Sequence, residues 1–248
     1  MKYIHIFIVA CLLTSGCASK KTNDAAPPES PQKLYSDAAE AFRKKNYSKA
    51  SELFARVAYE FPYYEGAKQA MSMDIYTQYM NQDYDSVVLS IDNFLKTYPM
   101  ASEVSYMYYM RAISYYDQIS NPFRDQSVTV KSKQALSQVI QRFPNTKYAL
   151  DAKMKLDLVE DHLAAQEIIV GRYYLNRGEL LAALKRFNIV VKKYSTTSHV
   201  DEALYRLFEI YNFMGNVSEA KKTTATLGYN YPNSRWYKSA YSILKHQK

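Results

Sequence analysis

The chain repeats one pattern along most of its length: an aromatic residue followed by proline, with a stripe of small and apolar residues before it. Four copies are intact and one is degenerate: Phe61-Pro62, Tyr98-Pro99, Phe143-Pro144, Tyr194-Ser195 and Tyr231-Pro232. The stripe lies 12, 8 and 5 residues before the proline position, as at Ala50, Phe54 and Val57 in the first copy. These offsets share one face of a helix, and proline ends such a helix because it removes a backbone donor.

Turn-forming residues separate this helix from an earlier one. They lie 16 or 17 residues before the proline position, at Asn46, Asp83, Gly178 and Gly215, whereas the third copy lacks the turn and carries an insertion at residues 120–124. Each unit of helix, turn, helix and proline resembles the tetratricopeptide repeat (TPR). Successive proline positions are 37, 45, 51 and 37 residues apart, which predicts extended helices or loops in the middle. We therefore predict an all-α fold, an α-solenoid of about five TPR-like helix pairs.

The repeat domain is predicted to cover residues 33–248, with N-terminal repeats at about 33–144 and C-terminal repeats at about 145–248. Residues 233–248 are expected to form a C-terminal capping helix over the last apolar face. Stacked helix pairs offer an extended groove, so this architecture is typical of binding scaffolds.

A secretion signal precedes the repeats. The chain begins with a positively charged residue, Lys2, and a short apolar run follows it and precedes Cys17. This run is too short to span a membrane as a helix. We expect residues 1–16 to be removed and Cys17 to carry a diacylglycerol and an N-acyl chain. Cleavage before Cys11 would leave an h-region of only about seven residues. An ordinary cleaved signal without a lipid is the other alternative.

The segment between the signal and the repeats, residues 17–32, holds three prolines and no large apolar side chain. Such a segment is predicted to be a flexible tether. Ala18 follows the cysteine, and in enteric-type sorting an Asp at that position retains lipoproteins in the inner membrane. Its absence points to a lipid-anchored protein on the periplasmic face of the outer membrane.

Composition excludes several kinds of function. The two cysteines, Cys11 and Cys17, lie in the signal or at its end, so the mature chain has no thiol for a disulfide, a metal or catalysis. No catalytic or nucleotide-binding motif occurs, and six glycines in 248 residues are too few for the usual phosphate-binding loops. The net charge is +8, and in this compartment the basic residues are expected to face acidic partner surfaces, anionic lipid or peptidoglycan rather than nucleic acid. The lysines are scattered along the chain, so a solvated surface is the simpler interpretation. We expect neither an enzyme nor a metal protein.

One local group of polar side chains could suggest chemistry, the consecutive residues Glu160, Asp161 and His162. Consecutive side chains on a helix point to different faces and cannot converge on one metal ion. This run is therefore predicted to be solvated surface.

Tyrosine is unusually frequent, with 25 in the chain. Tyrosine combines contact area with a polar tip and is enriched in binding hot spots. Five tyrosines of the first three repeats are therefore candidates for a binding groove: Tyr35, Tyr76, Tyr79, Tyr106 and Tyr109. Packing between repeats is the alternative for each of them.

Several longer motifs follow one another in order between about residues 34 and 211. They are YMYYMR at 106–111, RDQ at 124–126, FPNT at 143–146, LVEDHLA at 158–164 and AALKR at 182–186. This series resembles the BamD/ComL family, repeat lipoproteins of the outer-membrane β-barrel assembly (BAM) complex. The resemblance implies a scaffold whose N-terminal repeats bind the terminal segment of unfolded outer-membrane proteins. It also implies C-terminal repeats that dock on the periplasmic domains of a BamA-like barrel protein, with other BAM lipoproteins as further partners.

The same resemblance marks residues for partner docking. Arg186 matches the family position implicated in docking, and Arg177 lies one helix earlier. An arginine can clamp a carboxylate bidentately, and Arg186 has no acidic residue four positions away in its helix, which favours an external partner. Arg124 and Asp125 lie in a predicted loop, where function concentrates. An ion pair within the loop is the alternative for those two.

Two other functions fit a repeat lipoprotein. A pilotin that escorts a secretin would bind a secretin subunit, whereas a peptidoglycan-associated, competence-type lipoprotein would sediment with purified sacculi. The sequence leaves both open.

Overall fold

The computed structural model describes residues 29–246, and within that range the chain forms eleven α-helices and no strand. In chain order they are α1 (Pro31–Arg43), α2 (Tyr47–Glu60), α3 (Ala67–Met80), α4 (Tyr84–Thr97), α5 (Val104–Tyr116), α6 (Ser127–Arg142), α7 (Lys147–Asn176), α8 (Leu180–Lys193), α9 (Val200–Phe213), α10 (Val217–Asn230) and α11 (Arg235–His246). The predicted all-α fold is confirmed. Between residues 29 and 246, none of the helices has the length and apolar character of a membrane span.

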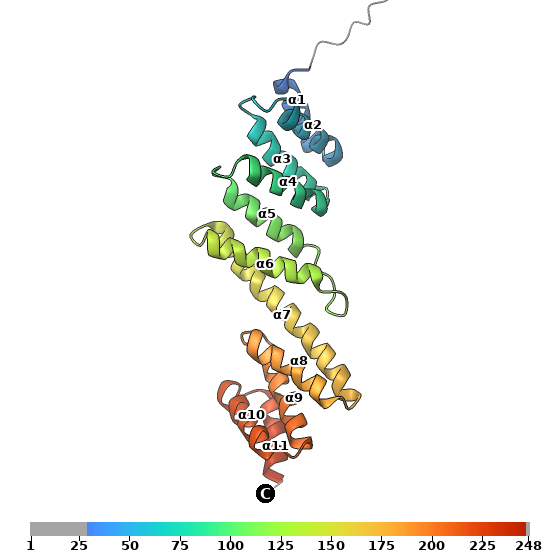
Figure 1. The fold of residues 1–248 in the computed structure, drawn as a ribbon, viewed down its shortest axis with the longest axis vertical. Helices are drawn as coiled ribbons and strands as arrows, with labels where there is room; N and C mark the ends of the chain where they lie inside the picture. The colour runs from blue at the N-terminus through green and yellow to red at the C-terminus, as the bar shows by residue number, and fades with distance from the viewer. Residues whose placement is uncertain (1–28, 247–248) are drawn as a thin grey trace, which may run out of the picture.

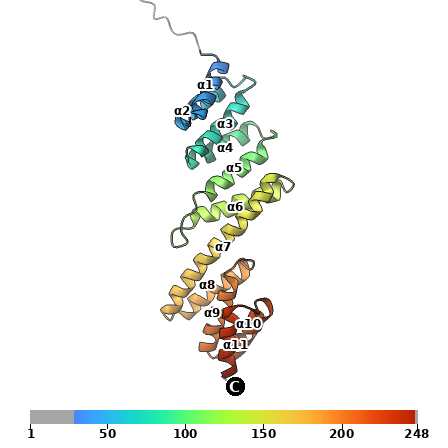
Figure 2. The same cartoon turned by 180° about the vertical axis from the view of Figure 1, so that it is seen from behind.

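The helices stack along one long axis, from α1 at one end to α11 at the other (Figure 1). Each helix packs mainly on its neighbours in sequence, and short turns make successive helices antiparallel. The view from behind shows the same order of layers (Figure 2). The chain is therefore an α-solenoid of helix pairs, as predicted.

The stripe that precedes each aromatic-proline copy forms the core of its pair. All fifteen side chains at offsets 12, 8 and 5 are at most 4% exposed, and Phe54, Phe94 and Phe187 are among the largest fully buried side chains. The aromatic residue of each copy is the C-cap of α2, α4, α6, α8 or α10. α8 ends at the same place as the others although Ser195 replaces proline there.

Four turns within the helix pairs share one backbone geometry. The residue 17 positions before the proline position has a positive φ in each: Lys45 (60°), Gln82 (60°), Gly178 (75°) and Gly215 (73°). Asn46 and Asp83 follow the first two and accept hydrogen bonds from backbone N–H groups in the first turns of α2 and α4. The left-handed position is visible in the sequence where glycine holds it, but not where lysine or glutamine does.

The two long spacings in the middle of the chain have different causes. A connection at residues 117–126 joins α5 to α6, and α7 runs for 30 residues where α6 has 16 and α11 has 12. The N-terminal half of α7 packs on α6 through Ala152, Val159 and Leu163. Its C-terminal half packs on α8, where Gly171 leaves room for the ring of Phe187. The expected extended helix and loop are both present.

The ends of the array define its limits. α1 begins at Pro31 and is capped by the side chain of Ser30, so the last two residues of the predicted tether are helical. α11 packs on α9 and α10 and buries Ala240, as expected of a capping helix. The predicted signal at residues 1–16 and the predicted lipid site at Cys17 lie outside the described residues.

Candidate functional site

A shallow hollow lies on α3 and α5 in the N-terminal repeats. It has a volume of about 290 Å³ and is lined by Gln69, Ser72, Met73, Tyr76, Glu103 and Tyr106. Lys68 pairs with Glu103 at its edge, with 2.8 Å between Nζ and Oε1. Burial raises the pKa of Tyr106 to about 12, so its hydroxyl stays protonated and can donate a hydrogen bond. Two of the five predicted tyrosines thus lie together at one opening.

The other three predicted tyrosines pack between helices. The ring of Tyr35 meets Phe54 edge-on, with 5.3 Å between centroids. The hydroxyl of Tyr79 donates to Asp117, and that of Tyr109 donates to Asp151 with an oxygen–oxygen distance of 2.7 Å. Burial raises the pKa of both tyrosines, and these carboxylates add to the effect. The packing alternative fits these three better than a place in a groove.

Arg186 has a partner within its own chain. Its Nη1 lies 3.1 Å from Oε2 of Glu167 on α7. α8 itself offers Arg186 no acidic partner four positions away, as the sequence indicated, but the neighbouring helix α7 does, so the lack of a partner in α8 no longer favours an external one. Arg177 is the C-cap of α7; its Nε lies 3.0 Å from Oε1 of Glu179, and its Nη1 donates to the hydroxyl of Tyr173 at 3.1 Å.

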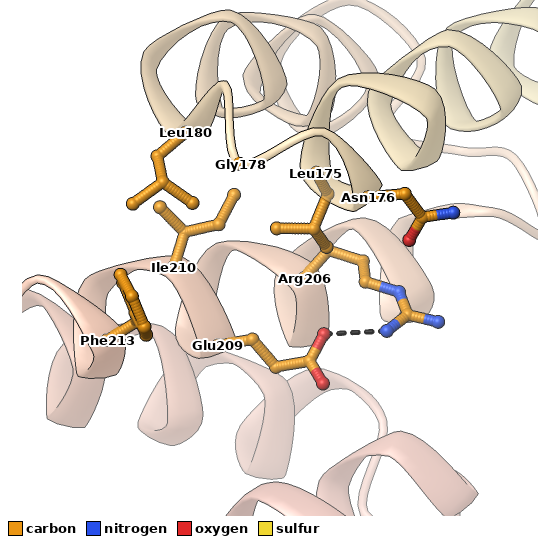
Figure 3. A pocket seen from close by; sticks show the side chains of 8 residues that line it. All are labelled: Leu175, Asn176, Gly178, Leu180, Arg206, Glu209, Ile210 and Phe213. Atoms are coloured by element: carbon orange, nitrogen blue, oxygen red, sulfur yellow. Dashed lines mark hydrogen bonds and ion pairs between the residues drawn. The ribbon is translucent and has the colours of Figure 1, made fainter.

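A larger pocket lies between the α7–α8 turn and α9 (Figure 3). Its volume is about 520 Å³, and its lining is Leu175, Asn176, Gly178, Leu180, Arg206, Glu209, Ile210 and Phe213. Arg206 and Glu209 form an ion pair at one side, with 2.7 Å between Nη1 and Oε2. Leu180, Ile210 and Phe213 lie at the other side (Figure 3). The pocket can accept an apolar side chain next to a charged group.

Four exposed apolar side chains extend the surface around this pocket: Leu181, Phe213, Met214 and Val217. We call these residues the C-terminal apolar edge. They flank the turns at Gly178 and Gly215, and Phe213 is 80% exposed. Exposed apolar groups gathered in this way are typical of protein contact surfaces. The predicted docking residue Arg177 lies in the first of these turns. The C-terminal apolar edge itself was not predicted from the sequence. Apolar residues next to the predicted turns were the signal that could have indicated it.

Glu202 of α9 links that helix to α7 and contacts Arg206, which lines the pocket. It is 7% exposed and accepts a hydrogen bond from Nε of Arg172 at 2.6 Å. Arg206 lies on its other side, with 3.5 Å between Nε and Oε1, and stacks over Trp236 at 5.1 Å. This group, not foreseen from the sequence, fixes α7, α9 and α11 relative to one another.

The loop between α5 and α6 holds the other two predicted docking residues. Asp125 accepts hydrogen bonds from the hydroxyl and the backbone N–H of Ser127, which lowers the pKa of Asp125. Arg124 is exposed and forms no ion pair within residues 29–246, so the suggested pair within the loop is absent there. The amide of Gln126 donates to the carbonyls of Asn121 and Arg124 and holds the loop in shape.

The run from Glu160 to His162 is more than the solvated surface that was predicted. Glu160 pairs with Lys133 of α6 at 2.9 Å. Asp161 accepts a hydrogen bond from the backbone N–H of Ser198 at 3.0 Å and so ties α7 to the turn before α9. No group of three or more metal-ligand side chains gathers anywhere in the described part of the chain.

Stacked helix pairs with two openings and an exposed apolar edge place the chain in the class of helical repeat proteins, an architecture typical of binding scaffolds. The chain belongs to the YfiO family of outer membrane lipoproteins, whose family model matches residues 27–227.

Known proteins resemble the chain over nearly its whole length. It is 43% identical to outer membrane protein assembly factor BamD of Rickettsia prowazekii, with 98% of this chain and 97% of that protein covered. It is 40% identical to BamD of Caulobacter vibrioides, with 96% and 78% covered. Among solved structures it is similar to the type IV pilus biogenesis factor PilW, with 13% identity, a TM-score of 0.36, and 84% and 97% covered. The predicted family is confirmed, and it is a family of assembly factors rather than enzymes.

Proposed function

We propose that this chain is a lipid-anchored scaffold of a β-barrel assembly complex on the periplasmic face of the outer membrane. The observation that carries the proposal is 40–43% identity to BamD proteins along nearly the whole chain. The acyl chains on Cys17 would hold the helical array at the membrane. Its partners would be a BamA-like barrel protein, other BAM lipoproteins and unfolded outer-membrane proteins.

In this proposal the hollow on α3 and α5 receives the terminal segment of an unfolded barrel protein. Aromatic walls at Tyr76 and Tyr106 and a polar edge at Glu103 suit an extended aromatic segment. A labelled C-terminal peptide of an outer-membrane barrel protein would be titrated with the full chain and followed by fluorescence anisotropy. Tyr76→Ala is expected to weaken binding by at least about tenfold, as hot-spot tyrosines do. Tyr229→Ala, at an exposed site on α10, is the control, and equal affinities for both variants would assign Tyr76 to packing.

The C-terminal apolar edge is the proposed docking surface for a periplasmic domain of the BamA-like protein. Phe213 and Leu181 supply apolar area, and the nearby Arg177 supplies a charge at the rim. Phe213→Glu should weaken binding of the purified periplasmic domains by at least about tenfold, because it places a charge in an apolar contact. Tyr229→Glu is again the matched control. Binding that survives Phe213→Glu would move the docking surface elsewhere.

The pairing of Arg186 with Glu167 allows its role to be tested separately. Arg186→Glu is expected to weaken docking, but it also breaks the contact between α7 and α8. The double variant Arg186→Glu with Glu167→Arg restores the internal pair with reversed charges. If the double variant binds normally, Arg186 acts by positioning α8. If only an acidic-to-basic change on the partner restores binding, Arg186 contacts the partner.

The anchor and the complex can be tested in membranes. Cys17→Ser should abolish lipid labelling, whereas Cys11→Ser should not, and the reverse result would move the lipid to Cys11. Pull-down in mild detergent should recover a BamA-like barrel protein. Recovery of a secretin instead, or sedimentation with purified sacculi, would favour the alternative functions.

A further inference from the structure

The motif YMYYMR at residues 106–111 has two sides, and only one of them borders the hollow on α3 and α5. Tyr106 lines that hollow. Successive residues of a helix are about 100° apart, so Tyr108 and Arg111 lie on the opposite side of α5 from Tyr106. There Tyr108 packs on Phe143, directly after α6, with 5.4 Å between ring centroids. The second side of the motif is therefore a separate surface.

Two arginines meet at Tyr108 on this surface. Cζ of Arg111 lies 5.7 Å from the centre of the Tyr108 ring, and Cζ of Arg142, at the end of α6, lies 5.0 Å from it. Nη1 of Arg142 also donates a hydrogen bond to the Tyr108 hydroxyl at 2.9 Å. We call Arg111 and Arg142 the arginine pair. One tyrosine side chain thus positions two guanidinium groups that come from different helices.

The positive charge of the arginine pair is only partly balanced. Arg111 donates to Asp92 of α4 through Nη2, and no other carboxylate within residues 29–246 forms an ion pair with either arginine. Nε of Arg111 is buried and has no hydrogen-bond partner among the described residues. Two positive charges therefore face one negative charge, and one guanidinium group is incompletely hydrogen-bonded. Buried donors are normally paired, so this site is expected to gain an acceptor from outside the chain.

The depth of the site indicates what kind of anion can reach it. The side chain of Arg111 is 18% exposed, whereas that of Asp92 is 63% exposed. A flat anionic membrane would meet the carboxylate of Asp92 before it reached Arg111, and the like charges would repel. A carboxylate at the end of a single side chain can pass Asp92. The planar guanidinium group also matches a carboxylate, which it can bind through two hydrogen bonds.

We propose that the arginine pair binds an aspartate or glutamate side chain of a partner protein. The carboxylate accepts hydrogen bonds from both arginines, and its apolar stem packs against the ring of Tyr108. An acidic partner suits a chain whose net charge is +8. This surface lies away from the hollow at Tyr106 and from the C-terminal apolar edge, so a partner held here leaves both of them open.

Glutarate, which carries the same carboxylate as a glutamate side chain, is a direct probe. Thermal unfolding of the full chain in detergent would be followed by circular dichroism in up to about 100 mM glutarate, with sodium chloride at matched ionic strength as the reference. Binding to the folded chain should raise the thermal midpoint by at least about 2 °C over the reference. Arg142→Gln, at an exposed site, should abolish this rise without changing the helix content.

The matched control is Arg43→Gln at the end of α1, because Arg43 is also an exposed arginine without an ion pair in the described part of the chain. It should keep the full rise in glutarate. Equal midpoints in glutarate and in chloride for the unmodified chain, or equal loss in both variants, would overturn the proposal. A larger rise with glycerol phosphate than with glutarate would assign the arginine pair to a lipid headgroup and would also overturn it.

Peptides test the same contact in a protein context. A rhodamine-labelled peptide with one glutamate between leucines, and the same peptide with glutamine, would be titrated with the full chain and followed by fluorescence anisotropy. The glutamate peptide should bind at least about tenfold more tightly, because its hydrogen bonds are charge-assisted. Arg142→Lys should reduce this preference to about threefold or less, since lysine keeps the charge but loses the planar fork. Arg43→Lys should leave it unchanged, and equal affinities of the unmodified chain for both peptides would refute carboxylate recognition.

Discussion

Asp74 is a carboxylate buried in the N-terminal core, and replacing it with asparagine is expected to stabilise the protein at high pH. The residue is 2% exposed and lies on α3, where it accepts hydrogen bonds from Ser51 and Gln78. Burial raises its pKa from 3.8 to about 6, and these two hydrogen bonds oppose the shift only partly. Oε1 of Gln78 is buried without a partner among the described residues, so an asparagine amide would gain an acceptor there.

The size of the effect follows from the pKa. One unit corresponds to about 1.4 kcal/mol, so a rise from 3.8 to about 6 means that ionised Asp74 costs the fold about 3 kcal/mol. The folded state binds the proton more tightly than the unfolded state does. The contribution of protonated Asp74 is therefore fully present below about pH 4 and is lost as the pH rises through about 6.

Thermal unfolding followed by circular dichroism between about pH 4 and pH 8 tests this reasoning. The gain from Asp74→Asn should be largest at the top of this range, up to about 3 kcal/mol, and should vanish at the bottom. Asp85→Asn, at an exposed site on α4, should change stability by less than about 0.5 kcal/mol. If Asp74→Asn and the unmodified chain show the same pH dependence, the buried carboxylate does not carry the cost assigned to it.

Four further substitutions test the packing of the array. Lys45→Gly and Gln82→Gly should each raise the unfolding free energy in urea by about 0.5–1 kcal/mol, because relief of a left-handed side chain outweighs the added chain entropy. Gly171→Ala should lower the thermal midpoint by the equivalent of about 1–3 kcal/mol, because its Cβ would lie 2.5 Å from the ring of Phe187. Glu202→Ala should cost about 1–3 kcal/mol and shift the fluorescence of the single tryptophan, because it leaves two arginines without their shared carboxylate.

The repeat architecture could be predicted because its signal is local. A buried residue such as Phe54 lies eight positions before Pro62, and the whole stripe lies within one helix. The positive φ could be predicted at only two of these four turns, because Lys45 and Gln82 adopt it without the glycine that usually marks it. Packing on both sides of those turns, rather than local preference, holds the backbone there.

The candidate site was less predictable because its contacts join different helices. Arg186 meets Glu167 across 19 residues of sequence, and Arg172 meets Glu202 across 30. Neither pair has a helical spacing, so each depends on which helices become neighbours. The same holds for Tyr109, whose hydroxyl donates to Asp151 on α7, a contact that favours the packing alternative.

The long helix α7 explains how the two proposed binding surfaces relate. The predicted division between N-terminal and C-terminal repeats, at residues 144 and 145, falls just before α7 begins at Lys147. α7 then pairs with α6 through Glu160 and with α8 through Glu167, so one continuous helix belongs to both halves. A flexible joint at that division would let the halves move independently. A shared helix instead holds the hollow at Tyr76 and the C-terminal apolar edge at a fixed separation, as a scaffold that brings two partners together requires.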